Sequence, residues 1–151
     1  MQQPHDDAVD EIIRLFGTSA FRSTMGMRIL RPTDPIASTQ AIEAIVECDV
    51  SPAFANTQGV AHGGLISGLI DTAAGVAVKL AARDAHLPVA TVSLTLNYHR
   101  PGRVGSTLRA VGRRISGTGT VCCTVEVHDD QGEHIATGLA TLRAHTRKPN
   151  A

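Results

Sequence analysis

The sequence predicts an α+β fold in which one curved antiparallel sheet wraps a single long, apolar helix. A polar, glycine-rich segment, 56–64, runs directly into 65–82, where apolar residues cover most of the circumference of a helix. Segments with strand character then follow one another between Val89 and His145. Because a helix that is apolar all round has to be buried, we expect the strands to form a layer around it.

Shorter elements are expected ahead of this helix. Residues 1–8 are expected to be disordered, and 8–16 to form an amphipathic helix that Gly17 ends. The segment 20–27 fits no single pattern. A strand, a turn and a longer strand are expected after it, at 27–30, 31–35 and 37–50.

The clearest strand is 89–98, in which apolar and polar residues alternate as in a sheet with one buried face. The apolar positions after its first residues are Val92, Leu94, Leu96 and Tyr98. Three further strands are expected at 104–115, 120–128 and 134–145, with turns at 116–119 and 129–132. Such a sheet leaves an edge strand uncovered, so we expect self-association.

The chain has 151 residues, enough for one domain with a full core. We expect residues 1–24 to be an extension with a short helix, 25–145 to be the domain, and 146–151 to be a frayed tail. The charge is balanced, with 14 basic and 14 acidic side chains, and only 3% of residues are aromatic. Both observations argue against a nucleic-acid partner, and the charge balance argues against a membrane-surface partner.

The three cysteines, Cys48, Cys122 and Cys123, have neither metal-ligand spacing nor the even number of a disulfide framework. We interpret them as small buried side chains in a reducing compartment. The polar, acidic first residues lack the pattern of a signal peptide, so the predicted location is cytoplasmic.

Asp71 lies inside the otherwise apolar helix, where a charge needs either a partner or a chemical role. A poorly solvated carboxylate is a better base, whereas a purely structural Asp would be held by an amide or a hydroxyl. At the start of the same helix, Gly63 and Gly64 leave backbone amides uncovered at the positive end of the helix dipole.

One set of polar residues and glycines has a distinctive spacing: Asn56, Gly59, His62, Gly63, Gly64, Asp71 and Thr91, followed by the segment SLTLNYHRP. This pattern resembles the hot-dog-fold acyl-CoA thioesterases. It is most similar to their phenylacetate-pathway (PaaI-type) branch, which includes small 4-hydroxybenzoyl-CoA thioesterases. The resemblance extends over residues 25–144, and Ala61 departs from it where the family often has a larger apolar residue.

The resemblance implies a hot-dog fold in which two protomers join their sheets edge to edge. It implies active sites at the dimer interface, and dimers that commonly pair into tetramers. The implied reaction is hydrolysis of an acyl-CoA thioester without a metal or redox cofactor, the CoA being part of the substrate.

The same resemblance implies a role for each site residue. Asp71 would be the general base or, through a mixed anhydride, the nucleophile. The Gly63 amide would polarise the thioester carbonyl, and Asn56 would reach the reacting region from the facing subunit. His62 is expected to organise the loop by hydrogen bonding rather than to shuttle a proton, and Thr91 to hold the attacking water.

For the CoA phosphates we prefer Arg113 and Arg114, because guanidinium groups suit phosphate and a glycine-containing turn follows them. Backbone amides at Gly117 and Gly119 could approach a pyrophosphate, and Gly64 is expected beside the substrate. A solvated strand face is the alternative for any single arginine.

Two other functions remain open, a non-catalytic acyl-CoA-binding protein and a hot-dog dehydratase or hydratase. The second would need a catalytic histidine paired with an acid at another spacing. Asp71 favours an enzyme over a binding protein, because a binding protein has no need of a poorly solvated carboxylate beside the acyl group.

Overall fold

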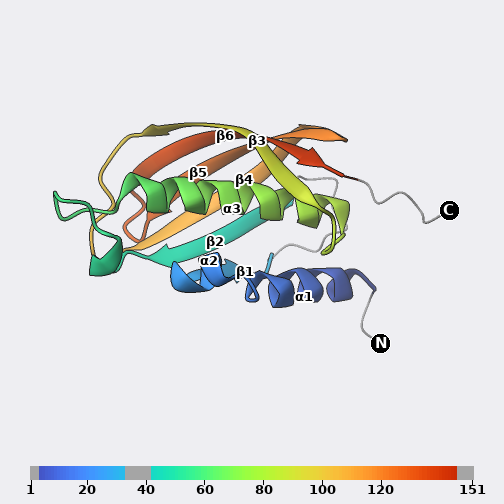
Figure 1. Ribbon diagram of the computed structural model, residues 1–151, viewed down its shortest axis with the longest axis horizontal. Coiled ribbons are helices and arrows are strands. Elements are labelled where there is room, and N and C mark those ends of the chain that lie inside the picture. The colour runs from blue at the N-terminus through green and yellow to red at the C-terminus, as the bar shows by residue number, and fades with distance from the viewer. Residues whose placement is uncertain (1–3, 33–41, 146–151) are drawn as a thin grey trace.

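The computed structural model describes residues 4–32 and 42–145. Two N-terminal helices, α1 (Pro4–Phe16) and α2 (Ala20–Thr24), precede the long helix α3 (Gly63–Ala82). The strands are β1 (Met27–Leu30), β2 (Glu43–Asp49), β3 (Val89–Tyr98), β4 (Thr107–Gly117), β5 (Thr120–Asp129) and β6 (His134–Ala144). One 3-10 turn, η1 (Pro52–Phe54), opens the loop before α3 (Figure 1).

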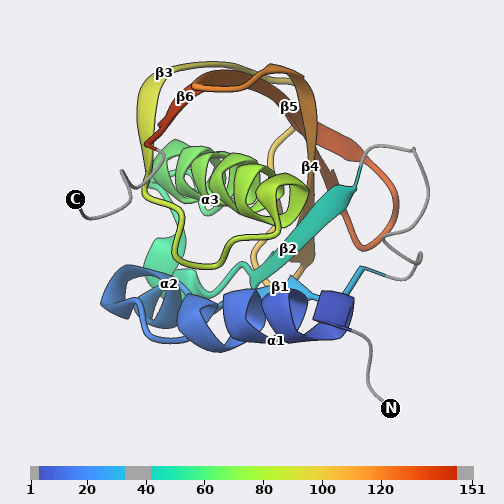
Figure 2. The same ribbon diagram turned by 90° about the vertical axis from the view of Figure 1, so that its right-hand side faces the viewer.

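The strands form one antiparallel sheet in the order β1-β2-β4-β5-β6-β3. The sheet curves around α3, which runs through its hollow side, as the end-on view in Figure 2 shows. The predicted α+β architecture is therefore confirmed, and it is the hot-dog fold. β3 pairs with β6 rather than with β4, so β1 and β3 are the two edges.

The core lies between α3 and the sheet. Leu69, Ile70 and Ala73 of α3 are fully buried. Two strand glycines allow the helix to approach closely: a Cβ at Gly138 would lie 2.5 Å from Ile70 Cγ2, and one at Gly112 would lie 2.7 Å from the Ala73 carbonyl oxygen. α3 is long and apolar enough to span a membrane, but this is weak evidence, because a buried core helix has the same composition.

The N-terminal helices belong to this packed unit. Val9, Ile12 and Phe16 of α1 are buried, and α1 contacts α3 on the side that the sheet leaves open (Figure 2). The prediction of disorder over residues 1–8 was wrong for residues 4–8, which are helical, and residues 1–3 lie outside the described part. The predicted helix end before Gly17 is confirmed.

Most element boundaries agree with the sequence prediction, and the differences have local causes. β1 and β3 have the predicted ends. α3 begins at Gly63 instead of residue 65, because the His62 side chain caps it. β4 begins at Thr107 instead of residue 104, because Gly105 has a φ of +87° in a turn.

Three predicted segments reach beyond the described residues. The predicted strand 37–50 is observed as β2, and its first part, 37–41, cannot be compared. The same holds for 33–35 of the predicted turn and for the tail 146–151. The turn predicted at 116–119 is shorter, because β4 continues through Gly117, whose φ is +94°.

The predicted alternation of β3 was wrong at two positions. Leu94 and Leu96 are partly buried as expected, but Val92 is 64% exposed and Tyr98 is 52% exposed. The register of β3 against β6 shifts between Thr91 and Ser93, so Val92 is a bulge residue. A bulge reverses which face the side chains occupy, and here it turns Thr91 toward α3.

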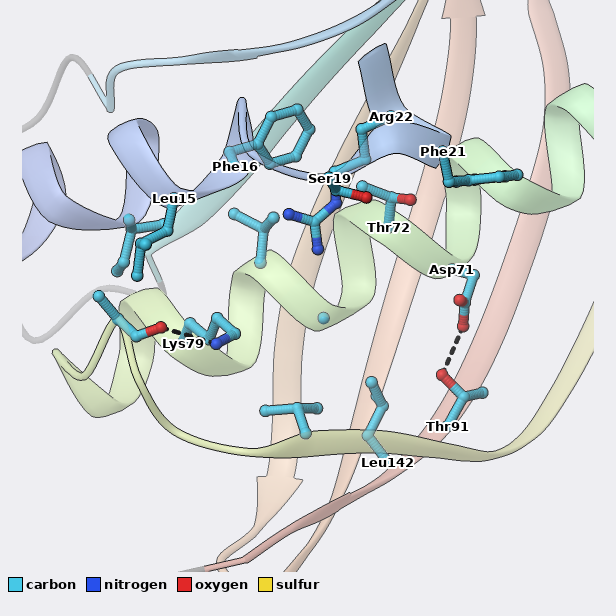
Figure 3. A pocket seen from close by; sticks show the side chains of 15 residues that line it. Leu15, Phe16, Ser19, Phe21, Arg22, Asp71, Thr72, Lys79, Thr91 and Leu142 are labelled. Atoms are coloured by element: carbon cyan, nitrogen blue, oxygen red, sulfur yellow. Dashed lines mark hydrogen bonds between the residues drawn. The ribbon is translucent and has the colours of Figure 1, made fainter. Parts of the chain in front are cut away.

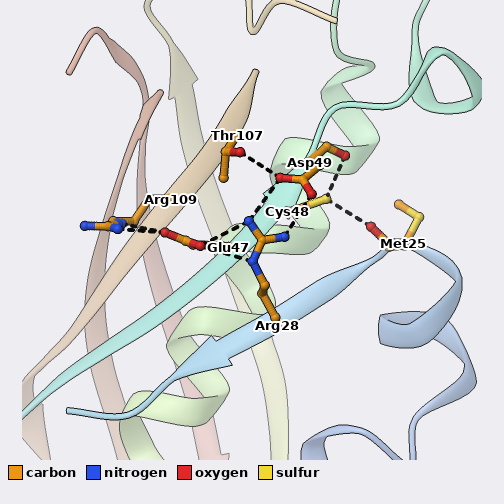
Figure 4. A network of polar contacts seen from close by, with 7 residues as sticks. All are labelled: Met25, Arg28, Glu47, Cys48, Asp49, Thr107 and Arg109. Atoms are coloured by element: carbon orange, nitrogen blue, oxygen red, sulfur yellow. Dashed lines mark hydrogen bonds and ion pairs between the residues drawn. The ribbon is translucent and has the colours of Figure 1, made fainter. Parts of the chain in front are cut away.

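A network of charges joins β1, β2 and β4 on the side of the sheet away from α3 (Figure 4). Arg28 of β1 pairs with Glu47 and, through two hydrogen bonds of 3.0 Å, with Asp49. Arg109 of β4 pairs with Glu47 at 2.8 Å, and Thr107 donates to Asp49 at 2.7 Å. These contacts hold the edge strand β1 in register.

The cysteines are free thiols. Cys48 and Cys123 are buried and Cys122 is partly buried. Burial raises the pKa of the Cys48 and Cys123 thiols to about 11, so both are protonated at neutral pH. The interpretation of the cysteines as core side chains is confirmed for these two.

Candidate active site

A short hydrogen bond joins the central helix to the edge strand. The Thr91 hydroxyl of β3 donates to Oδ1 of Asp71 on α3 at 2.5 Å (Figure 3). Twenty residues separate the two positions in sequence, and the bulge at Val92 is what brings them together. The second carboxylate oxygen of Asp71 has no hydrogen-bond partner within the described residues.

Asp71 lies on the one side of α3 that is not fully buried. Positions four residues apart share a helix face, and the members of this row are all only partly buried. They are Gly63, Ser67, Asp71, Gly75 and Lys79. The expectation that α3 is buried all round was therefore wrong along this row, so the Asp71 carboxylate meets a pocket instead of the core.

This cavity, the Asp71 pocket, has a volume of about 330 Å³. α1, α2, α3, β3 and the connection between α3 and β3 all contribute to its lining. Asp71 and Thr91 lie at one end of the pocket, whereas Arg22 and Lys79 lie farther along it (Figure 3). Sequence reasoning missed Arg22, Gly75 and Lys79 as site residues, although the four-residue spacing from Asp71 could have identified the last two.

The start of α3 forms a second polar group. The Gly64 amide donates to Nδ1 of His62 at 2.8 Å, and the Tyr98 hydroxyl donates to the Gly63 carbonyl at 2.9 Å. Among the described residues the Gly63 amide has no hydrogen-bond partner. The Gly63 N–H is therefore an unused donor, as far as the described residues go, at the positive end of the helix dipole.

Asn56 and Gly63 share a cavity of about 370 Å³ with Tyr98. The Asn56 side-chain oxygen accepts from the amides of Gln58 at 2.9 Å and Val60 at 3.3 Å, so it holds the turn together. Its side-chain NH₂ group has no partner among the described residues. His62 and Gly64 line a different cavity, beside Met25 and Phe54.

One chain does not bring these two groups together. Asp71 follows Gly63 by eight residues in α3, which corresponds to a rise of about 12 Å. A thioester carbonyl that accepts a hydrogen bond from Gly63 therefore lies out of reach of the Asp71 carboxylate of the same chain.

The predicted phosphate ligands already have partners within the protein. Arg113 pairs with Glu43 at 2.7 Å and with Glu126 at 3.4 Å, and the Arg114 guanidinium donates to the Gly117 carbonyl. The Gly119 carbonyl accepts from the Ala144 amide at 2.9 Å. The hairpin between β4 and β5, which contains Arg114, Gly117 and Gly119, lies at the same end of the sheet as the beginning of β3.

Among the described residues no three His, Cys, Asp or Glu side chains are arranged to hold a metal ion. Lys79 and Arg22 make the Asp71 pocket suitable for an organic anion rather than for a metal.

Residues 58–136 match the family model described as the thioesterase superfamily. The PaaI protein of E. coli from the phenylacetic acid degradation operon has a similar structure, with a TM-score of 0.79 and 21% identity over 95% of this chain and 97% of that chain. The TT0310 protein of Thermus thermophilus superimposes with a TM-score of 0.69 at 25% identity, over 83% and 97% of the two chains.

A hypothetical thioesterase protein of Streptococcus pneumoniae, solved with coenzyme A, has a TM-score of 0.67 and 21% identity over 82% of this chain and 91% of that chain. The matches at 21% identity establish a common fold. No protein of curated function matches the chain.

Proposed function

The chain belongs to the thioesterase superfamily, and we propose that it hydrolyses an acyl-CoA thioester to a free acid and CoA. The observation that carries this proposal is the Asp71–Thr91 hydrogen bond at one end of a pocket that both apolar and polar side chains line. A carboxylate with a fixed orientation and one open oxygen is what the activation of water, or direct attack on a carbonyl, requires.

In the general-base route, the open oxygen of Asp71 takes a proton from water while the water oxygen attacks the thioester carbon. The tetrahedral intermediate then collapses, the C–S bond breaks, and CoA leaves as a thiolate that takes the proton from Asp71, which restores the carboxylate. The Thr91 hydroxyl donates to Asp71 and can accept a hydrogen bond from the same water.

In the nucleophilic route, the Asp71 carboxylate attacks the thioester carbon directly and expels CoA, which leaves a mixed anhydride. Water then hydrolyses the anhydride and restores the carboxylate. Both routes place negative charge on the carbonyl oxygen, so both need a hydrogen-bond donor there.

We assign that donor to Gly63 of a second copy of the chain. β3 is an edge strand, and it carries Thr91 near its beginning and Tyr98 at its end. If two β3 strands pair antiparallel about a two-fold axis, the Thr91 end of one lies beside the Tyr98 end of the other. That arrangement brings Asp71 of each copy toward the Gly63 amide and Asn56 of the other.

The exposure of β3 supports this assembly. Val92 and Tyr98 are large side chains that stay exposed on the edge strand, at 64% and 52%. An exposed edge strand presents unpaired backbone N–H and C=O groups, and it is usually paired or covered in a stable protein. Two copies would then have two complete sites, each divided between the chains.

The CoA phosphates remain assigned to Arg114 and to the turn between Gly117 and Gly119. Arg113 is the weaker candidate, because Glu43 and Glu126 already neutralise its charge. Within the described part of the chain, Arg114 binds only a backbone carbonyl, so further N–H groups of its guanidinium are available for phosphate.

The test is a thiol-release assay with a panel of acyl-CoA thioesters on the wild type and on Asp71→Asn. We expect turnover by the wild type, and a loss of at least about 100-fold in kcat for the variant. Turnover that survives Asp71→Asn at nearly the wild-type rate would remove Asp71 from the mechanism. A wild type that binds acyl-CoA without hydrolysing any thioester would favour the non-catalytic binding protein.

A further inference from the structure

Two cationic side chains line the Asp71 pocket beyond its catalytic end. Arg22 reaches in from α2, and Lys79 projects from the second turn of α3 after Asp71 (Figure 3). Of the described residues that line the pocket, Asp71 is the only one with a carboxylate. The far part of the pocket is therefore positively charged.

Neither cation forms an ion pair with a described carboxylate. The Arg22 guanidinium lies 4.6 Å from the centre of the Phe16 ring, which supports one face of the group. Lys79 Nζ donates to the Ala85 carbonyl at 2.7 Å, which is its one hydrogen bond to a described residue, so two of its three N–H groups are left for a ligand.

The surroundings make these positive charges costly. Burial lowers the pKa of the Arg22 guanidinium from its ordinary value, and the charge of Asp71 opposes this effect only in part. The pKa of the Lys79 ammonium is lowered as well, first by burial and then by the charge of Arg22, against an opposing effect of Asp84. Two partly buried cations that repel each other are stabilised by an anion placed between them.

The geometry of α3 gives that anion a position relative to the reacting carbon. Asp71, Gly75 and Lys79 lie on one face of the helix, and about 12 Å of rise separates the first from the last. A Cβ at Gly75 would meet no heavy atom within 4 Å, so the glycine leaves the path between Asp71 and Lys79 open.

We propose that the Asp71 pocket binds acyl groups whose far end carries a carboxylate, so that the preferred substrates are CoA monothioesters of dicarboxylic acids. This inference rests on the proposed thioesterase function. The thioester lies against Asp71 and Thr91, and the terminal carboxylate lies between Arg22 and Lys79.

The pocket dimensions support the acyl group as the occupant. A volume of about 330 Å³ is at the low end for small-molecule pockets, roughly 300–1,000 Å³, and suits an acyl chain better than the much larger CoA group. The methylene groups of such a chain would contact the apolar walls, which Ile12, Val76 and Leu142 provide.

The test compares succinyl-, adipyl- and suberyl-CoA with butyryl-, hexanoyl- and octanoyl-CoA, the neutral thioesters of matching chain length. The proteins are the wild type, Arg22→Gln, Arg22→Lys and Lys79→Gln, with Arg14→Gln as the control. Arg14 is an exposed arginine of α1 that pairs with Glu11 outside the pocket, so its variant removes the same charge from a neighbouring site.

We expect the wild type to have a higher kcat/KM for at least one dicarboxylyl thioester than for its neutral match. Arg22→Gln should lower that kcat/KM by about 10- to 100-fold and change the value for the neutral thioester by less than about twofold. Lys79→Gln should act in the same direction, Arg22→Lys should retain part of the preference, and Arg14→Gln should retain all of it.

Other outcomes would overturn the inference in distinguishable ways. Equal losses on charged and neutral thioesters, or a wild type that prefers the neutral series, would exclude a carboxylate subsite while leaving the thioesterase function intact. A weaker product inhibition by free CoA in Arg22→Gln, with no change in acyl preference, would assign Arg22 to the CoA phosphates instead. No hydrolysis of any thioester by the wild type would refute the proposed function itself.

Discussion

Thr91 donates a 2.5 Å hydrogen bond to Oδ1 of Asp71, and this contact depends on an irregularity of the edge strand. The bulge at Val92 shifts the register of β3 between Thr91 and Ser93. In a regular strand, Thr91 would face away from α3 and Val92 would face toward it. The bulge therefore leaves the Val92 side chain exposed and places the Thr91 hydroxyl beside the Asp71 carboxylate.

The first prediction concerns this hydrogen bond. Replacing Thr91 by Val removes the donor while keeping the side-chain shape, so the Asp71 carboxylate loses the hydrogen bond that fixes its orientation. We expect kcat to fall by about 10- to 100-fold, while the melting temperature changes little because Thr91 is exposed.

Thr91→Ser is the matched control, because it restores the hydroxyl and loses only the methyl group. Steady-state kinetics of both variants beside their thermal unfolding check the prediction. A Ser variant as slow as the Val variant would show that the methyl group, not the hydrogen bond, is what matters.

The second prediction concerns substitutions of Gly75. It is an interior residue of α3, where glycine is less favourable than alanine by about 0.5–1 kcal/mol. A Cβ there would meet no heavy atom within 4 Å, so we expect Gly75→Ala to raise the free energy of unfolding by about that amount. The added methyl group would project into the Asp71 pocket.

Gly75→Leu should then obstruct the pocket without disturbing the core. We expect kcat/KM for octanoyl-CoA to fall by at least about tenfold, and kcat/KM for acetyl-CoA to change much less. Chemical denaturation of the Gly75 variants measures their stability, and the kcat/KM values for octanoyl-CoA and acetyl-CoA measure the obstruction of the pocket. A variant that loses activity on both thioesters to the same extent would place the acyl chain elsewhere.

The sequence predicted the parts of the molecule that local patterns determine. The alternation in 89–98 predicted the ends of β3 correctly, and the apolar run after residue 64 predicted α3 to within two residues. Long-range pairing is not encoded in such patterns, so the position of β3 beside β6 and the bulge at Val92 were not foreseen.

The candidate site likewise contains residues that a local sequence pattern predicts and residues that only the packing of distant segments brings in. The motif identified Asp71 and Thr91, which the structure brings together, and Asn56 and Gly63, which it holds in a separate group. Arg22 was missed because its segment, 20–27, has no clear periodicity and reaches the pocket only through the packing of α1 and α2. Lys79 was visible as the second four-residue step after Asp71, but it was interpreted only as an interruption of an apolar helix.

The third prediction concerns acid stability and the Arg28–Asp49 pair. Hydrogen bonds from Arg28, and then from Thr107, hold the pKa of the Asp49 carboxyl below its ordinary value. A carboxylate whose pKa is lower in the folded state stabilises the fold at pH values above its unfolded pKa of about 3.9. That contribution is lost as the pH falls through the folded pKa.

We therefore expect Asp49→Asn to be less stable than the wild type at pH 7 by about 0.2–1 kcal/mol, a range that takes the exposure of the pair into account. The difference should shrink below about pH 4, because the wild-type carboxyl then becomes neutral as well. Thermal unfolding of both proteins between neutral pH and strong acid measures it. A difference that persists in strong acid would mean that the charge of Asp49 is not its cause.

The last prediction tests the division of the site between two chains. A valine side chain at residue 63 would obstruct the approach of the thioester oxygen to the residue 63 amide. The space there is already small, since even a Cβ at residue 63 would lie 3.0 Å from the Tyr98 hydroxyl oxygen. Gly63→Val and Asp71→Asn should each be inactive alone, for different reasons. In a mixed dimer, one site combines both altered residues, while the other combines the intact Asp71 of one chain with the intact Gly63 of its partner.

Unfolding the two variants together and refolding them as a mixture should therefore recover about a quarter of the wild-type activity, since half of the dimers are mixed and each has one intact site. The single variants, refolded alone in the same way, are the controls. If each chain contained a complete site, every site in the mixture would keep one of the two defects, and the mixture would be no more active than the average of its components. Sedimentation of the refolded mixture shows whether dimers have formed, so that a lack of recovered activity is not confused with a lack of assembly.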